Sequence, residues 1–346
     1  LCYKKLSMST KNSSVNLKNG FKESKDLSKI FSNFKSKLNL TNKKKFVVAV
    51  SGGPDSLALA ALSKAYTYYY KSKFYYVLIN HNIRRNSSQE AKKVKNLLKK
   101  KQIHLKIISN KKKIEKNIQG EARKIRYELL SNFCLKNNIR SLITAHNLED
   151  QVETFLIRLS RGSGLRGLSA MRPKSKISSK IDLYRPLLDT KKEFLIKISK
   201  KTFGNFIKDP SNKNLKYLRT KVRSLKKPLE KSGVEYEQIF KSIRNLSYSR
   251  DSLDDFLKKE FSKIIKKKDS EILINLKKFQ NHNNEIKIAI INASIKKLKK
   301  NYYDPRAKKV INLIRTIDKK GFKKSTLGGC IFFKKGINLC LKKEKL

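Results

Sequence analysis

The sequence is short of acidic residues. It has 27 Asp and Glu against 84 Lys and Arg among 346 residues, which gives a formal net charge of +57. So large an excess attracts polyanions, because neutralised phosphates release their condensed counterions. The many lysines also fit translation of an AT-rich genome, but drift of that kind does not explain the shortage of acids. We therefore predict a nucleic-acid partner, with an anionic membrane surface as the weaker alternative.

Cysteine is also scarce, and no long apolar run is present. The four cysteines are widely spread, without a C-x-x-C pair or a partnering histidine. This pattern argues against a zinc site or a disulfide framework and fits a reducing compartment. No stretch reaches the roughly 20 apolar residues of a membrane span, and the N-terminus lacks a signal-peptide core. We expect no membrane and a cytoplasmic protein, or one of an organelle matrix or stroma in a eukaryotic host.

Apolar runs alternate with helical patterns from residue 46 to residue 159. Phe46–Val50 is a short Val-rich run, typical of a buried strand. Further strands are expected at 75–80, 105–109 and 141–144, and helices at 56–69, 88–101, 119–136 and 148–159. This alternation predicts an α/β fold, a doubly wound parallel sheet whose ligands bind at the carboxyl ends of its strands. An amphipathic helix with Leu27, Phe31 and Phe34 is expected to precede it.

The second half of the sequence has another character. Beyond Gly233 no glycine occurs until Gly321, which favours helices, and a Lys-Lys-Gly turn predicts a closing hairpin of 326–333 with 337–341. We predict a C-terminal, mostly helical basic domain ending in a small hairpin. The expected division is a disordered tail at 1–23, an α/β domain at 24–230 and a basic domain at 231–346. Lysine clusters at 266–268 and 296–300 are expected to contact nucleic-acid phosphates.

A glycine-rich loop follows the first strand and opens a helix. Its residues are Ser51, Gly52, Gly53, Pro54, Asp55 and Ser56. Two glycines let the backbone approach an anion, and the helix N-terminus and the serine hydroxyls add hydrogen-bond donors. No lysine follows the glycines, so this is not the Walker loop. The string resembles the phosphate loop of the ATP-pyrophosphatase (PP-loop) superfamily, which implies an adenine nucleotide alpha hydrolase-like fold and ATP as co-substrate.

Further motifs indicate one family within this superfamily. They are His81–Arg85, Gln119–Arg123 with Arg126, Thr144–Thr154, Arg161–Leu168, Arg185–Leu188, Asp209–Asn212, and Arg219 with Arg223. Together they resemble the tRNA(Ile)-lysidine synthetase family over about residues 46–229, with Thr220 where that family has Asn. The resemblance implies a carbon–nitrogen ligase, with 24–230 as its PP-loop catalytic domain and 231–346 as its basic tRNA-binding domain. ATP would adenylate the wobble cytidine of tRNA(Ile) with a CAU anticodon, and L-lysine would then displace AMP and leave lysidine.

Charged residues after the strands are the candidate catalytic groups. Arg126, with Arg123 second, is the candidate for stabilising the charge of phosphoryl transfer, although both also suit a solvated helix face. His146, Asp150 and Glu153 share one side of a helix start. Asp150 or Asp55 could bind Mg²⁺, with the metal ligands otherwise open, and Glu153 could orient or deprotonate lysine. Alternatively, Glu149 and Asp150 simply complement the helix dipole behind an Asn147 cap.

Other loops and other functions stay open. The loop 161–168 suits a substrate phosphate, a lid or a plain connection, and Arg84 and Arg85 suit the nucleotide, the tRNA or the open surface. The nearest alternative function is ATP-dependent tRNA thiolation, which normally needs reactive cysteines; here only Cys134 lies in the catalytic half. A small-molecule amidating ligase would not explain the basic C-terminal half. We expect no protein partner other than a second copy of the chain.

Overall fold

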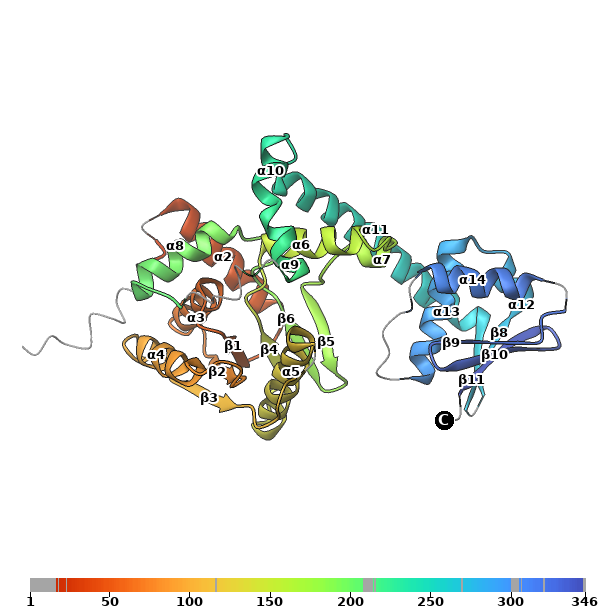
Figure 1. The fold of residues 1–346 in the computed structure, drawn as a ribbon, viewed down its shortest axis with the longest axis horizontal. Coiled ribbons are helices and arrows are strands. Elements are labelled where there is room, and N and C mark those ends of the chain that lie inside the picture. Colours follow the sequence, from red (N-terminus) through yellow and green to blue (C-terminus); the bar gives the residue numbers. More distant parts are fainter. Residues whose placement is uncertain are drawn as a thin grey trace, which may run out of the picture. The chain divides into compact units, whose positions relative to one another are not determined.

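The computed structural model describes residues 17, 19–22, 24–115, 117–207, 214, 216–268, 270–299, 305, 307–319 and 321–344. The chain divides into two compact units. The first comprises residues 1–154 and 171–236, and the second comprises 155–170 and 237–346. The segment 155–170 thus belongs to the second unit, although it lies far from the rest of that unit in the sequence. Figure 1 gives the element labels used below.

A six-stranded sheet forms the centre of the first unit, in the order β3-β2-β1-β4-β6-β5. Its strands are β1 (Lys45–Val50), β2 (Lys73–Asn80), β3 (Leu105–Ser109), β4 (Ser141–Ile143), β5 (Lys174–Ser178) and β6 (Ile181–Tyr184). All neighbours pair in parallel except β5 and β6, which are antiparallel. The predicted parallel α/β sheet is confirmed, whereas β5 and β6 were not predicted.

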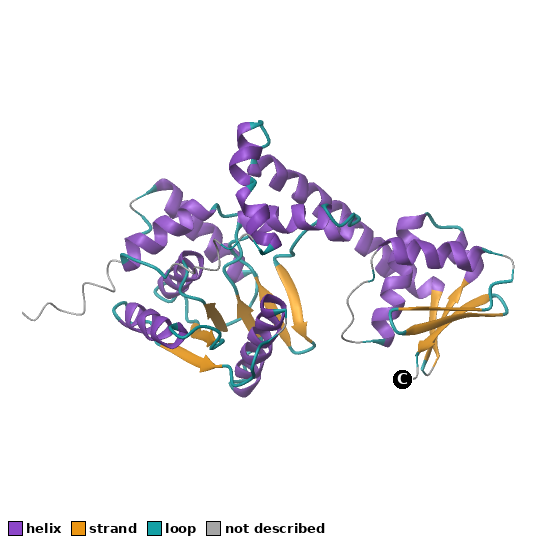
Figure 2. Ribbon diagram, in the orientation of Figure 1, coloured by secondary structure: helices purple, strands orange, loops and turns teal. Residues whose placement is uncertain are grey.

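Helices cover both faces of this sheet, as Figure 2 shows. They are α2 (Lys25–Asn39), α3 (Pro54–Tyr66), α4 (Ser87–Lys99) and α8 (Lys192–Phe203) on one face and α5 (Ile118–Lys136) on the other. The unit also contains the start of α6 (Leu148–Leu159), α9 (Leu218–Ser224) and α10 (Lys226–Lys231). Phe46 and Val48 of β1 join a core with α2, α3, α4 and α8, while Val47 joins a second core with α5. Successive strand residues point to opposite faces, so a strand buried on both sides reads as one apolar run.

The segment before α3 packs more fully than expected. The amphipathic helix is α2, which buries Leu27, Phe31, Phe34 and Leu38 as its periodicity predicted. The prediction of a disordered tail at 1–23 needs a correction where the structure describes that segment. Phe21 is 4% exposed, and its ring centroid lies 5.2 Å from that of Phe31. Apolar contact with α2 therefore orders this part of the segment; residues 1–16, 18 and 23 lie outside the described residues.

The second unit is mostly helical, as predicted, but it also contains more strands than the closing hairpin. Its elements are α7 (Leu165–Leu168), α11 (Tyr236–Ile264, whose first residue belongs to the first unit), α12 (Leu276–Gln280), α13 (Asn284–Leu298), α14 (Ala307–Asp318), β7 (Ile265–Lys268), β8 (Glu271–Asn275), β9 (Lys324–Leu327), β10 (Cys330–Lys335) and β11 (Asn338–Lys343). The closing hairpin is present as β10 and β11, and it belongs to an antiparallel five-stranded sheet. Positive φ angles at Gly328 and Gly329 separate β9 from β10, so the predicted strand 326–333 is two strands.

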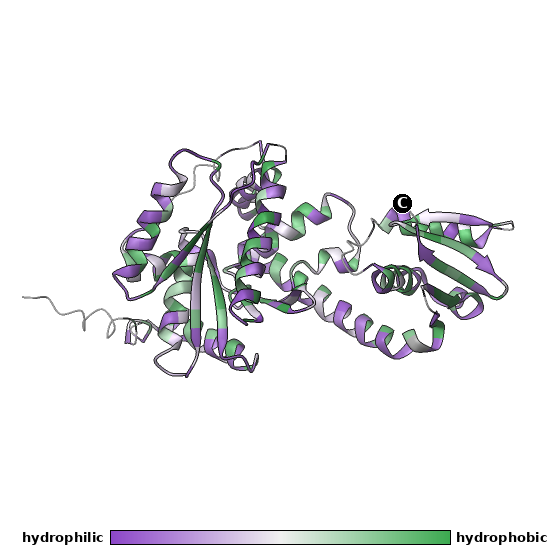
Figure 3. Ribbon diagram, turned by 90° about the horizontal axis from the view of Figure 1, so that it is seen from below, coloured by the Kyte–Doolittle hydropathy of each residue, from purple (hydrophilic) through white to green (hydrophobic). Residues whose placement is uncertain are grey.

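The distribution of hydropathy explains both units. Figure 3 shows mostly hydrophobic strands inside the sheets and helices that alternate between hydrophobic and hydrophilic residues. In the second unit, apolar side chains of α13 and α14 pack with those of β8, β10 and β11. Among the residues that the structure describes, no helix is both long and apolar enough to cross a membrane.

Candidate active site

The loop at residues 51–56 joins β1 to α3 at the carboxyl edge of the sheet. Ser56 Oγ accepts hydrogen bonds from the backbone N–H groups of Ser51 and Gly52, both at 3.1 Å, and donates to the Gly53 carbonyl at 3.0 Å. Gly52 has φ +85°, and a Cβ there would lie 2.5 Å from Val94 Cγ2. Pro54 opens α3, where its missing N–H is no loss. The loop is therefore a fixed turn at the positive end of a helix, a favourable place for an anion.

Asp55 lies in the first turn of α3. Its Oδ2 is 3.8 Å from Lys192 Nζ, while its Oδ1 is buried without a hydrogen-bond partner among the described residues. Burial raises the pKa of Asp55 to about 6, against the attraction of Lys192; Asp150 and Glu149 raise it further by repulsion. The same interactions show that Asp55 lies close to Asp150. The structure thus brings together two of the predicted site residues from helices far apart in the sequence.

Asp150 and Glu153 lie on α6, and two arginines of α9 bind them. Arg219 donates to Asp150 Oδ1 at 2.8 Å and to Glu153 Oε2 at 2.7 Å. Arg223 donates to both oxygens of Glu153, at 2.7 and 3.1 Å. The Glu153 side chain is only 2% exposed, so this network is largely withdrawn from water. Burial alone would lower the pKa of Arg219, but the two carboxylates raise it overall.

The start of α6 also has the expected cap. Asn147 Oδ1 accepts from the Asp150 N–H at 2.9 Å, and Asp150 Oδ2 accepts from the Asn147 N–H at 3.1 Å. These reciprocal bonds satisfy two N–H groups that a helix start leaves open. Asp150 therefore has the structural role that the sequence left as an alternative. Its catalytic role stays a prediction.

Glu149, which the sequence assigned only to the helix dipole, joins the site together with two lysines that the sequence did not single out. Glu149 Oε2 accepts from the backbone N–H of Lys192 at 2.9 Å, and its Oε1 lies 3.3 Å from Lys226 Nζ. Glu149 thus ties α6 to the starts of α8 and α10. The sequence did contain a signal for Lys192. A cation in the first turn of a helix is unfavourable for the helix dipole, so a lysine at that position suggests a specific acidic partner. That partner is Asp55, 137 residues earlier.

His146 and the arginines of α5 form the positive part of the site. Nδ1 of His146 lies 2.8 Å from Thr144 Oγ1. Burial lowers the pKa of His146 to about 3, and the charges of Arg185, Arg123, Arg219 and Arg126 add to the effect. The imidazole is therefore neutral at physiological pH. Four arginines therefore act on this one ring, and arginines near a binding site attract phosphates.

Arg84 and the second glycine-rich loop have partners outside this cluster. Arg84 forms an exposed ion pair with Glu90 at 3.0 Å. The loop 161–168 belongs to the second unit, where Arg166 pairs with Asp254 at 2.6 Å and Arg158 donates to the Gly167 carbonyl at 2.8 Å. There it forms a fixed connection to α11. The predicted turn at 209–212 lies outside the described residues.

The donor set fits Mg²⁺ at Asp55. This ion usually takes one or two carboxylates together with substrate phosphates and water. Asp55 Oδ1 has no hydrogen-bond partner in the part of the chain that the structure describes, whereas both oxygens of Asp150 already accept hydrogen bonds. No group of three or more His, Cys, Asp or Glu side chains placed to hold a metal occurs in the described part of the chain. Asp55 is therefore the better of the two predicted metal ligands.

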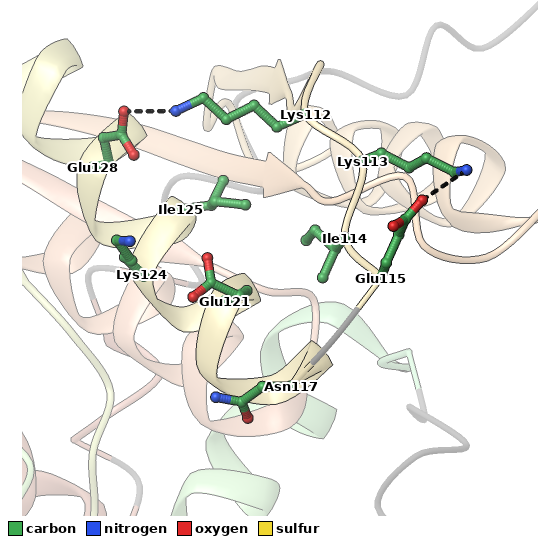
Figure 4. A pocket seen from close by; sticks show the side chains of 9 residues that line it. All are labelled: Lys112, Lys113, Ile114, Glu115, Asn117, Glu121, Lys124, Ile125 and Glu128. Carbon is green, nitrogen blue, oxygen red and sulfur yellow. Dashed lines mark hydrogen bonds and ion pairs between the residues drawn. The ribbon is translucent and has the colours of Figure 1, made fainter.

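A cavity of about 440 Å³ lies elsewhere on the first unit, between the loop after β3 and helix α5. Figure 4 shows Lys112 paired with Glu128 and Lys113 with Glu115 at its rim, and Ile114 and Ile125 between them. The helix positions that line it, including 121, 125 and 128, share one face. Arg123 and Arg126 lie on the other side of the helix. We therefore assign this cavity no part in the candidate active site.

Comparisons with known proteins agree with this geometry. A family model described as a PP-loop domain matches residues 23–229. The chain is 35% identical over 302 residues to the tRNA(Ile)-lysidine synthase of Wolbachia pipientis wMel, covering 86% of this chain and 70% of the relative. It is also 35% identical over 230 residues to that of Zymomonas mobilis, covering 65% and 68%.

A solved structure shows the same fold at a greater distance. It is the U34-tRNA thiolase NcsA from Methanococcus maripaludis with its [4Fe-4S] cluster, with a TM-score of 0.52, 19% identity, and coverage of 63% of this chain and 78% of that one. At this identity the likeness concerns the fold alone. The sequence matches are closer and longer, and they carry the assignment. The chain is a member of the tRNA(Ile)-lysidine synthase family of PP-loop proteins.

Proposed function

We propose that this protein ligates L-lysine to the wobble cytidine of tRNA(Ile) with a CAU anticodon, using ATP and releasing AMP and diphosphate. Family membership supports the reaction. In this chain, three features lie together at one edge of the sheet, and this observation carries the proposal. They are the loop at residues 51–56, the Asp55 oxygen that has no hydrogen-bond partner among the described residues, and the network of Asp150 and Glu153 with Arg219.

In the first step, the ring carbonyl oxygen of the cytidine attacks the α-phosphorus of ATP and diphosphate leaves. The helix start at Pro54 and the N–H groups of the loop favour the phosphates. Negative charge grows on the departing diphosphate, so nearby cations lower the barrier. Arg126 remains our candidate for that role, because its charge is among those that act on His146 within the site.

In the second step, the ε-amine of lysine attacks the activated ring carbon and AMP leaves. Only the neutral amine is nucleophilic, so the ammonium must lose a proton first. Glu153 is our candidate for orienting the ammonium or assisting this loss. Because both its oxygens accept from arginines, Glu153 also fixes Arg219 and Arg223 in the site.

We propose Mg²⁺ as the cofactor and Asp55 as its protein ligand. Bound there, the ion would neutralise charge on the ATP phosphates. The protein's own contribution is to keep the Asp55 carboxylate buried at the start of α3 and free of hydrogen bonds on one oxygen.

The second unit is our candidate for the main tRNA-binding surface. The side chains of Lys266, Lys267 and Lys268 are exposed on β7, the edge strand of the five-stranded sheet, and not on a helix as predicted. Exposed lysines on a sheet edge also prevent edge-to-edge aggregation, so they serve a folding purpose as well. Lys297 lies at the end of α13 with its Nζ 4.4 Å from the centroid of the Phe261 ring. Contacts between these lysines and tRNA phosphates would give affinity and fix the register of the tRNA, but they would not select its sequence.

No specific observation favours the thiolation alternative. Cys134 is fully buried in the core between the sheet and α5, and burial raises the pKa of its thiol to about 12. A thiol of this kind is a poor source of the thiolate that sulfur transfer requires. Cys134 therefore packs as an apolar residue.

Lysine incorporation tests the proposal. Purified protein is incubated with ATP, radiolabelled lysine and total tRNA, and both labelled tRNA and released diphosphate are measured. We expect label in tRNA only with ATP, and equal amounts of diphosphate. A sulfur donor is supplied in a parallel reaction. Label from the sulfur donor, or none from lysine, would contradict the proposed function.

A further inference from the structure

His81 is a polar residue beside the phosphate loop, and it has no role in the two proposed reaction steps. It directly follows β2, the parallel neighbour of β1, so it stands at the same carboxyl edge of the sheet as the loop at residues 51–56. Both ring nitrogens of His81 are buried, and neither has a hydrogen-bond partner among the described residues. Unpartnered buried polar atoms are rare in native proteins, and each one needs an explanation.

The backbone around His81 is firmly held, so loose packing is not the explanation. Asn80 Oδ1 accepts from the Asn82 N–H at 3.1 Å, and Asn80 Nδ2 donates to Ser88 Oγ at 3.0 Å. Asn82 Nδ2 donates to the Asn110 carbonyl at 3.0 Å. These asparagines tie the loop after β2 to α4 and to the loop after β3. The ring of His81 is thus held by a fixed segment, although its own nitrogens have no hydrogen-bond partner within the described ranges.

The electrostatic surroundings of His81 favour an anion. Burial lowers the pKa of His81 to about 4, and the charge of Arg126 lowers it further. The ring is therefore neutral at physiological pH and has one N–H to donate. Arg126 is our candidate for stabilising the phosphates, and its charge reaches the rings of both His81 and His146. An anionic oxygen placed near Arg126 would find a donor in His81.

We propose that His81 is a binding residue for the phosphate chain of ATP, whose neutral imidazole donates a hydrogen bond to a phosphate oxygen beside Arg126. This inference rests on the proposed use of ATP. It accounts for a ring whose segment is firmly held and whose buried nitrogens have no partner among the residues that the structure describes. It also explains why a histidine is useful beside an arginine, since the neutral ring adds a donor without a second repelling charge.

Calorimetric titration of the full chain tests the contact. The probes are α,β-methylene ATP, inorganic pyrophosphate and adenosine, and the variants are His81→Phe and His81→Gln. Phenylalanine keeps the flat ring and removes both nitrogens, whereas glutamine restores a donor. The matched control is His104→Phe, because His104 is exposed and precedes β3 at the opposite edge of the sheet.

We expect His81→Phe to weaken binding of α,β-methylene ATP and pyrophosphate about tenfold or more, as for a lost hydrogen bond to a charged group. Adenosine binding should not change, glutamine should recover part of the loss, and the His104 variant should match wild type. Equal losses for adenosine would overturn the assignment to phosphate and place His81 at the base or ribose. An unchanged affinity in a folded His81→Phe protein would overturn the contact altogether.

A second measurement does not depend on the stability of the variant. The sequence has four histidines, so ¹⁵N labelling of histidine gives few ring signals, and the His81 signals are those absent from His81→Gln. Pyrophosphate added to the wild-type protein should shift them and leave those of His104 unchanged. Unmoved His81 signals at saturation would contradict the inference. If wild-type protein binds neither α,β-methylene ATP nor pyrophosphate, it is the proposed function that fails.

Discussion

Two glycine-rich loops open helices in this molecule, and their surroundings differ. The loop at 51–56 begins α3, a helix of 13 residues that is almost wholly buried in the sheet's core. The loop at 161–168 begins α7, which has four residues, none of them buried. A long helix concentrates partial positive charge at its start, whereas a single turn does not. Glycine content was similar in both, but only the first loop has the helix that makes an anion site.

The side chains beside the two loops also differ. Beside the first loop, Asp55 keeps a buried oxygen without a partner among the described residues. Beside the second, Arg166 pairs with Asp254 and Arg158 donates to the carbonyls of Gly167 and Ala170. Charges satisfied within the protein stabilise a fold, while an unsatisfied group near a helix start is available to a ligand.

The largest effect is expected from Glu153→Gln beside the first loop. Glu153 is 2% exposed and accepts from Arg219 and Arg223. Removing its charge leaves two guanidinium groups with less compensation in a partly buried place, which costs about 3 kcal/mol after allowance for their exposure. In a unit of this size the Tm should fall by about 6–10 °C. Thermal unfolding by circular dichroism measures this. An unchanged Tm would mean that the network does not hold α9 on α6.

The second prediction compares one glycine from each loop. Gly52→Ala meets both a positive φ and a contact of 2.5 Å with Val94, so the loop must move. Displacement of a binding loop by about 1 Å can lower the rate about 100-fold. Gly162→Ala has only the strain of φ +65° and nothing within 4 Å, so it should cost about 1 kcal/mol of stability. ATP-dependent diphosphate release should separate them; equal rates would remove the functional difference between the loops.

The third prediction uses the raised pKa of Asp55, which is about 6 against an ordinary 3.8. The folded protein binds this proton more tightly than the unfolded chain. The stabilisation is therefore complete below about pH 4 and is lost as the pH rises through 6. Asp55→Asn cannot ionise, so the ligand-free variant should match wild type near pH 4 and exceed it by about 2 kcal/mol at pH 7. Urea unfolding at both pH values measures this, and a variant less stable at pH 7 would contradict it.

The sequence was sufficient to predict strands β1 to β4 of the first unit and the phosphate loop. Strands β1 to β4 are apolar runs, and the helices between them have clear periodicity. Strand β5 is Lys-Ser-Lys-Ile-Ser, with no apolar alternation to reveal it. Strand β7 continues directly from α11 and contains three lysines in a row. Its strand state depends on pairing with β8, which is a tertiary contact that local composition cannot report.

Most residues of the candidate site could be predicted from the sequence, but the contacts between them could not. Loop residues and the acids of α6 are local motifs. The pairing of Arg219 and Arg223 with Glu153 spans 66 and 70 residues, and Lys192 reaches Asp55 only because α8 packs beside α3. Such partners are set by the fold as a whole. The unpartnered nitrogens of His81 likewise become visible only when every neighbour is in place.

The smallest effect is expected from Asp254→Asn, beside the second loop. Arg166 Nη2 lies 2.6 Å from Asp254 Oδ1, with both side chains partly exposed. Asparagine keeps an acceptor and removes the charge, so the loss should be about 1 kcal/mol, or a Tm lower by roughly 2–4 °C. Diphosphate release per folded molecule should not change, because this pair only fastens the loop to α11.

The neighbouring Asp255→Asn is the matched control for that variant. Asp255 pairs with Lys258 at 2.7 Å, but both side chains are largely exposed. Solvent screens such a pair, so the Tm should stay within about 1 °C of wild type. If Asp254→Asn instead stops diphosphate release while the protein stays folded, the second loop acts on the substrate. The contrast between a ligand-binding loop and a structural one would then be lost, since both glycine-rich loops would serve the chemistry.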